Sequence, residues 1–174
     1  MLANIHCHMT LQKRRAAAKK FRPETVRLLL VAEAPPCDTE RYFYFERVDR
    51  HDWLFRYVWE GLTGEKPVRE TKAEHLRALR DAGVFMIDLH EENISEPTLT
   101  ELRACVPDLV ERCRALKPSA IVLIKSVVYD AAYEALRDDG LPVIDARMPF
   151  PASGQQRKFL VAFREAAAAA RFSM

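Results

Sequence analysis

The sequence predicts an α/β protein, a three-layer α/β/α sandwich around a central, mainly parallel four-stranded sheet. Short aliphatic runs alternate with longer segments whose apolar residues recur at helical spacing. The aliphatic runs are apolar at every position, as is typical of strands buried on both faces of a parallel sheet. The chain of 174 residues has the length of one domain and contains no visible linker. We therefore expect one domain over residues 23–174, preceded by a basic arm over residues 1–22.

Each element is assigned from its own pattern. The four aliphatic runs predicted as strands are residues 26–31, 84–89, 121–124 and, as a shorter strand, 143–144. The segments predicted as helices are residues 52–62, 72–82, 98–116, 127–137 and 155–172. Pro107 lies inside the third helix and is expected to divide it.

Composition excludes several classes of protein. Hydrophobic residues make up 49% of the chain and only 5 residues are Gly, so a disordered, collagen-like or low-complexity chain is ruled out. The longest apolar run, around Leu28 to Ala32, is far shorter than the roughly 18 residues of a membrane span. Residues 1–10 carry two His and no apolar core, so they do not resemble a secretory signal. We expect a cytoplasmic protein that contacts no membrane.

Charge is unevenly distributed, although the net charge is only +2. Six basic residues precede Glu24, the first acidic residue of the chain. They are Lys13, Arg14, Arg15, Lys19, Lys20 and Arg22. Such an arm can lie along nucleic-acid phosphates, because each neutralised phosphate releases counterions. The alternative is a solvated helix, which Ala16 to Ala18 favour.

The cysteine pattern predicts neither a metal site nor a cofactor site. Cys7, Cys37, Cys105 and Cys113 lack the paired spacing of zinc sites, so we expect reduced, mostly buried thiols. The tripeptide His6 to His8 also predicts no metal site, because adjacent residues on an extended chain point to opposite faces.

The strongest candidate functional residue is Glu33. In open α/β sheets, ligands bind at the carboxyl ends of the strands. Glu33 directly follows the first predicted strand and precedes Pro35 and Pro36, which would hold its carboxylate rigidly and partly out of water. A general base or an electrostatic stabiliser requires such a position. The alternative is a carboxylate that caps the next segment or pairs with an Arg.

Two further segments point to a ligand. Residues 42–45 are four consecutive aromatics, on which a flat ligand such as a base could stack for about 1 to 3 kcal/mol per ring. Only one or two of them can face a ligand, and aromatic runs commonly belong to the core. The proline loop 148–154 opens into the last predicted helix, whose backbone amides and dipole suit a phosphate. The alternative there is a Ser-capped helix whose basic residues face water.

These segments resemble the motifs of the uracil-DNA glycosylase superfamily. Residues 32–36, Ala-Glu-Ala-Pro-Pro, are similar to the Gly-Glu-Ala-Pro-Gly motif of its thermostable iron-sulfur branch. Residues 148–154 are similar to the His-Pro-Ser-Pro motif and the small-residue loop that follows it. Residues 85–89 resemble the middle strand, which in many members ends in an Asn, and residues 121–125 resemble the strand before the third crossover helix. The resemblance spans residues 26–172 in the family's order and implies the family's fold.

The resemblance and the motifs together assign roles to the candidate residues. Glu33 takes the place of the catalytic acidic residue. The residues expected to contact a base are Ala34, Pro35, Phe43, Phe45, Asp88 and Met148. The residues expected to hold phosphates are Lys125, Ser153, Gly154, Arg157 and Lys158.

Several positions depart from the family pattern. Met148 stands in place of the usual His, which removes the donor to the departing base. Asp88 stands in place of the Asn, and an ionised carboxylate accepts hydrogen bonds without donating them. It would favour bases with an exocyclic amine, or a hypoxanthine-like edge, over uracil. Ala32 replaces a glycine, and the cysteine spacing does not fit an iron-sulfur cluster.

The sequence therefore leads to a divergent DNA glycosylase. Its partner would be damaged or single-stranded DNA, and its reaction the hydrolysis of the N-glycosidic bond of a flipped base. An inactive relative that binds a nucleic acid or a nucleotide is the second hypothesis. An unrelated α/β enzyme or interaction domain with similar proline loops is the third. Composition does not set the oligomeric state.

Overall fold

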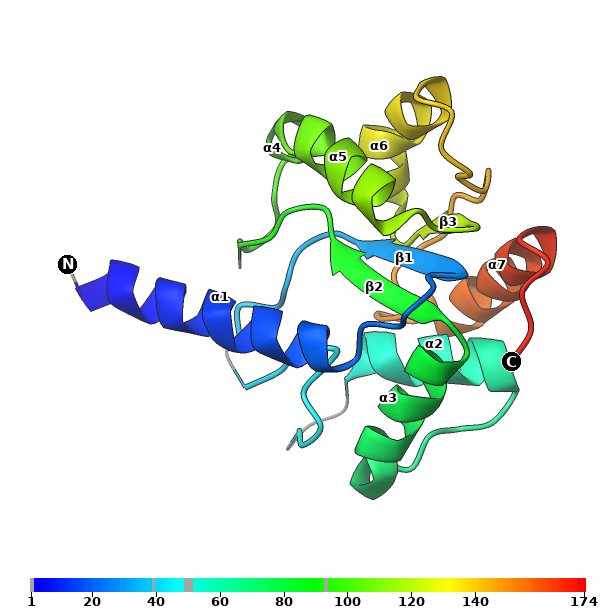
Figure 1. Ribbon diagram of the computed structural model, residues 1–174, viewed down its shortest axis with the longest axis horizontal. Helices are drawn as coiled ribbons and strands as arrows, with labels where there is room; N and C mark the ends of the chain where they lie inside the picture. The colour runs from blue at the N-terminus through cyan, green and yellow to red at the C-terminus, as the bar shows by residue number, and fades with distance from the viewer. Residues whose placement is uncertain (1, 39, 49–51, 93) are drawn as a thin grey trace.

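The α/β class is confirmed in a computed structural model, which describes residues 2–38, 40–48, 52–92 and 94–174, with side chains from residue 11 onward. A parallel sheet lies at the centre, flanked by helices (Figure 1). Its described strands, in the spatial order β2-β1-β3, are β1 (Leu28–Ala32), β2 (Val84–Asp88) and β3 (Ile121–Leu123). All residues of β1 and β3 are buried, as the continuous aliphatic runs predict.

The helices follow the predicted order. Their bounds are α1 (Leu2–Lys20), α2 (Trp53–Thr63), the 3₁₀ turn η1 (Arg69–Thr71), α3 (Lys72–Asp81), α4 (Leu99–Ala104), α5 (Val106–Leu116), α6 (Ser126–Asp138) and α7 (Gln156–Ala169). Helices α4, α5 and α6 gather on one side of the sheet, and α2, α3 and α7 on the other (Figure 1). The predicted helix over 98–116 is divided at Cys105, just before Pro107. None of the helices in the described ranges is long and apolar enough to cross a membrane.

The fourth predicted strand is reduced to one residue of pairing. Val143 forms a single parallel bridge with Ile121, and the described residues hold only three strands. The backbone N–H groups of Val143 and Ala146 each bond to the carbonyl two residues earlier, Leu141 and Ile144. These tight local bonds turn the chain, so it cannot continue along β3 as an extended strand.

The basic arm is a helix that packs beside the sheet. Phe21, just after α1, is 1% exposed and stacks on Tyr44 with ring centroids 6.2 Å apart. Arg14 is 2% exposed, and its Nη2 donates to the carbonyl of Pro36 at 2.9 Å. Residues 11–22 thus share the core of residues 23–174 instead of forming a solvated tail.

Several basic residues of α1 face acidic partners on the domain. The ion pairs are Lys13 with Glu40, Arg15 with Glu91 and Lys20 with Glu46. The tripeptide His6 to His8 belongs to the helix rather than to an extended chain, in the part of α1 whose side chains lie outside the described set. Among the thiols that the structure describes, Cys113 is buried and Cys105 partly so, as expected, whereas Cys37 is exposed.

The outer edge of β2 is closed by Tyr44. The Leu28 N–H donates to the Gly83 carbonyl, and the Leu89 N–H donates to the Ala32 carbonyl. Every second residue from 83 to 89 therefore points its backbone groups toward β1. The backbone groups of Met86 therefore point to the other edge. There the Tyr44 hydroxyl accepts from the Met86 N–H at 2.6 Å and donates to the Met86 carbonyl at 3.1 Å.

Removal of this hydroxyl should destabilise the fold. Tyr44→Phe leaves two buried backbone groups of Met86 without their partner, so we expect the free energy of unfolding to fall by about 2 kcal/mol. Urea denaturation measures it. Tyr57→Phe is the control, because the Tyr57 ring stacks on Trp53 while its hydroxyl bonds to no described residue. Equal stability of the two variants would show that Tyr44 does not seal the edge.

Candidate functional site

A cavity of about 500 Å³ opens at the carboxyl end of the sheet. Residues at the carboxyl ends of all three strands line it: residues 32–36 at the end of β1 and just after it, Asp88 at the end of β2, and Lys125 after β3. Of the predicted site residues, the cavity brings together Glu33, Ala34, Pro35, Phe43, Asp88 and Lys125. The position agrees with the general rule for ligand sites in parallel sheets.

Glu33 and Lys125 form an ion pair inside this cavity. In the parallel pairing of β1 with β3, Val31 lies opposite Leu123, so the residues two positions further along also face each other. There the Lys125 Nζ donates to Glu33 Oε2. On its other side, the Glu33 carbonyl accepts from the His90 N–H at 2.9 Å, which ties the loop to the chain leaving β2. Lys125 therefore holds the carboxylate, and the His90 N–H holds the backbone of the residue that carries it.

Lys125 has a strained backbone conformation at this position. Its φ of 82° and ψ of 133° lie in a region that residues with a side chain rarely adopt. Strained backbone of this kind gathers at functional sites, where the surrounding structure holds it. Lys125 precedes α6, and its carbonyl accepts from Val128 at 3.0 Å, which helps to hold it there.

The strain makes a prediction about stability. Lys125→Ala and Lys125→Gly both remove the ion pair with Glu33, so their difference reports on the backbone alone. Glycine usually costs stability relative to alanine, but here we expect Lys125→Gly to be more stable than Lys125→Ala by about 1 kcal/mol. Thermal denaturation of the two variants measures the difference. The usual order, with alanine the more stable, would contradict the strain.

Asp88 is the buried acid of the site. It is the last residue of β2, lies opposite Ala32 of β1 and is 8% exposed. Burial raises the pKa of its carboxyl from 3.8 to about 7, against the lowering effect of Arg14 and Arg112. Near neutral pH the group is thus present in both forms, and the protonated form donates a hydrogen bond. The sequence predicted that Asp88 only accepts hydrogen bonds, whereas in its protonated form it also donates one.

Aromatic rings form the walls of the cavity. Tyr42 and Phe43 line it from the aromatic run, whereas Phe45 lies outside the lining, under the ammonium of Lys13 at 4.9 Å. Two more rings join them, Trp53 of α2 and Phe150 of the proline loop, and they are 38% and 37% exposed. Trp53 was not predicted as a site residue from the sequence. Its place at the first turn of α2, next to the loop, was the available signal for a ligand role.

The remaining predicted residues lie elsewhere. Met148 is 1% exposed, belongs to the hydrophobic core and does not line the cavity. Ser153, Gly154, Arg157 and Lys158 are exposed around the start of α7, and they do not line it either. Phe150 is the residue through which the proline loop reaches the cavity.

A second cavity adjoins the first one. It has a volume of about 470 Å³ and lies between α1 and α5. Pro35, Tyr42, Met86 and Asp88 line both cavities and so form the wall between them. No group of three metal-ligating side chains occurs in the part of the chain that the structure describes.

No family model matches the chain, and a search of curated proteins gives no significant match. The functional conclusion therefore depends on the site itself.

Proposed function

We propose that the chain is a divergent relative of the uracil-DNA glycosylases, which binds DNA and hydrolyses the N-glycosidic bond of a flipped base. The observation that carries the proposal is the fixed Glu33 carboxylate in a cavity walled by aromatic rings, at the carboxyl end of a parallel sheet. A volume of about 500 Å³ is within the usual range for a small-molecule site and accommodates one base.

Glu33 has the position of an electrostatic stabiliser. When the bond between the base nitrogen and the sugar C1′ breaks, positive charge develops on the sugar. The Glu33 carboxylate would face this charge and orient the water whose oxygen adds to C1′, and the proton that this water loses ends on the departing base. Lys125 holds the carboxylate in one geometry, so little reorganisation is needed during the reaction.

Asp88 supplies a donor that Met148 does not provide. The bonding electrons leave with the base, which is stabilised if a hydrogen bond meets its developing negative charge. Met148 is buried in the core, but Asp88 lines the cavity, and its carboxyl can donate when protonated. Phe43 lies in the same wall and offers a ring face or edge to the flipped base.

One observation favours binding without hydrolysis as a second candidate. The charge of Glu33 is countered by Lys125 within the site, which weakens the field that the carboxylate exerts on a cationic sugar. A protein with this pair could hold a base or a nucleotide without cleaving it.

The test is a base-release assay with oligonucleotides that contain uracil, hypoxanthine, xanthine or a mismatch. Abasic sites are revealed by alkaline strand cleavage, and binding is recorded in parallel by fluorescence anisotropy. The proposal expects cleavage of at least one substrate. Binding without cleavage of any of them would support the second candidate, and the absence of both would overturn both.

A further inference from the structure

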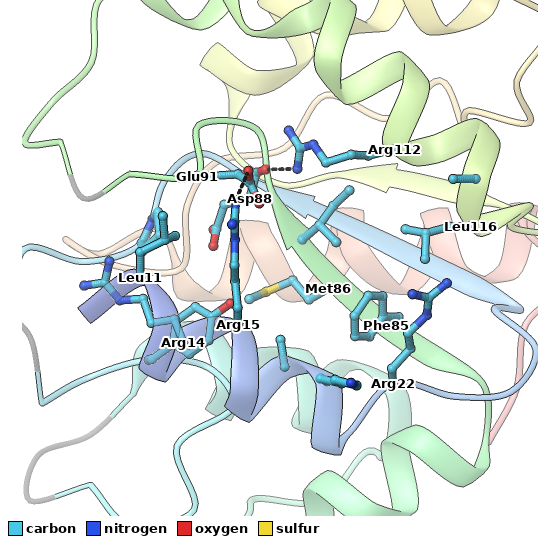
Figure 2. A pocket seen from close by; sticks show the side chains of 16 residues that line it. Leu11, Arg14, Arg15, Arg22, Phe85, Met86, Asp88, Glu91, Arg112 and Leu116 are labelled. Carbon is cyan, nitrogen blue, oxygen red and sulfur yellow. Dashed lines mark hydrogen bonds and ion pairs between the residues drawn. The ribbon is translucent and has the colours of Figure 1, made fainter. Parts of the chain in front are cut away.

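The cavity between α1 and α5 is an open groove along the outer edge of β2. Phe85 and Met86 of β2 lie on its floor, Leu116 of α5 closes one side, and α1 forms the other (Figure 2). These apolar side chains offer a surface that a flat heterocycle can cover. The volume of about 470 Å³ suits one such group with a charged substituent.

The groove is not shaped for strand addition by a peptide. A peptide that extends the sheet would need the free backbone groups of β2. The Tyr44 hydroxyl occupies both groups of Met86, and Arg112 Nη1 donates to the carbonyl of Asp88 at 2.8 Å. Side chains rather than the backbone of β2 are thus available to a ligand.

The charges around the groove favour an anion. Five cationic residues line it, against two acidic ones. The cations are Arg14, Arg15, Lys19, Arg22 and Arg112, and the acids are Asp88 and Glu91. Arg15 is paired with Glu91, and Arg112 with Asp108 (Figure 2 shows the first pair).

Positive charge remains in excess at the end of α1. Lys19 and Arg22 are exposed there, and neither forms an ion pair with a residue in the described part of the chain. One end of an apolar groove therefore presents two cations. The forked guanidinium of Arg22 suits the paired oxygens of a phosphate.

The groove lies directly beside the candidate site. Pro35, Tyr42, Met86 and Asp88 form the wall between the two cavities, so a strand with a base in the first can place a neighbouring nucleotide in the second. We propose that the α1–α5 groove binds a nucleoside phosphate, with the heterocycle over Phe85 and Met86 and the phosphate at Lys19 and Arg22. The ligand is either a free nucleotide or a unit of a single strand, and the strand form rests on the proposed function.

The experiment measures binding to the full chain by isothermal titration. The probes are adenosine 5′-monophosphate, adenosine, inorganic phosphate and a single strand of about ten nucleotides, a length within the usual site size. The nucleotide or the strand should bind more tightly than adenosine or phosphate alone. Binding of the nucleotide without the strand identifies a free nucleotide as the ligand, and the reverse identifies a strand.

A charge-reversed variant tests the assigned cations. Lys19→Glu/Arg22→Glu should weaken binding about tenfold or more, and the log–log salt slope for the strand should fall by about 0.7, for the one phosphate that the two residues hold. Arg77→Glu/Arg103→Glu is the control, because these exposed helical residues line neither cavity. Lys19→Gln/Arg22→Gln repeats the test if charge reversal lowers the melting temperature.

The outcomes separate this inference from the proposed function. Equal binding by the groove variants and the control, or no binding of nucleotide and strand to the unaltered protein, overturns the groove. Binding that depends on the groove residues, without base release from any substrate, supports the nucleotide site in the groove and contradicts the proposed glycosylase activity. Base release that survives in Lys19→Glu/Arg22→Glu at saturating strand, with weakened binding, supports both.

Discussion

Glu33→Gln should slow base release by about a hundredfold or more while leaving DNA affinity unchanged or slightly higher. The amide keeps the size of the side chain but loses the charge that would face the cationic sugar. Lys125 loses its anionic partner and is then available to a DNA phosphate, so binding should not weaken. Single-turnover rates with excess protein, together with anisotropy titrations, separate the two effects.

A matched change outside the cavity completes this test. Glu92→Gln removes the same charge from an exposed residue that lines neither cavity, and it should leave the rate within about twofold, as expected for a surface change. If Glu33→Gln also retained its rate, Glu33 would have no catalytic role, whatever substrate the protein cleaves.

Asp88→Asn should change how stability depends on pH. The pKa of Asp88 is about 7 in the folded protein, above its ordinary value of 3.8, because the carboxyl is buried. The folded state then binds more protons than the unfolded state between about pH 4 and 7. The contribution of this group is fully present below pH 4 and is lost as the pH rises through 7, by about 4 kcal/mol in total.

Urea denaturation at pH 5 and pH 8 measures the effect. The unaltered protein should lose more stability over this interval than Asp88→Asn, whose side chain is neutral throughout. Arg14, Arg112 and Glu91 surround the carboxyl and remain in both proteins, so the difference isolates Asp88. Identical pH profiles would show that the carboxyl is already ionised at pH 5 and cannot serve as a donor near neutral pH.

The sequence predicted the order of the elements well, because local patterns specify them. Continuous aliphatic runs indicated β1, β2 and β3 within two residues of their ends. The run at 143–144 has the same residue types, but two residues are too short to reveal that local backbone bonds turn the chain there.

The sequence predicted where the site lies, but it did not predict the contacts between the site residues. Glu33 and Lys125 were both expected at the carboxyl ends of strands, yet in separate roles, because their pairing depends on the register between β1 and β3. Register is a long-range property that a local pattern does not carry.

The basic arm shows the same limit. The charge of the arm indicated exposure to solvent or contact with phosphates, because arginine is seldom fully buried. The spacing of Leu11, Ala18 and Phe21 on one helical face with Arg14 was a usable signal that this face packs against the domain. Only the folded chain shows that Arg14 meets the Pro36 carbonyl beside the candidate site.

Mass spectrometry of the reaction products tests the proposed hydrolysis most directly. The unaltered protein, incubated with each base-containing oligonucleotide, should yield free base and abasic strand in equal amounts for at least one substrate, and Glu33→Gln should yield neither in the same time. Intact oligonucleotide in every reaction with the unaltered protein, despite measurable binding, would contradict a glycosylase and leave a cavity that binds without cleaving.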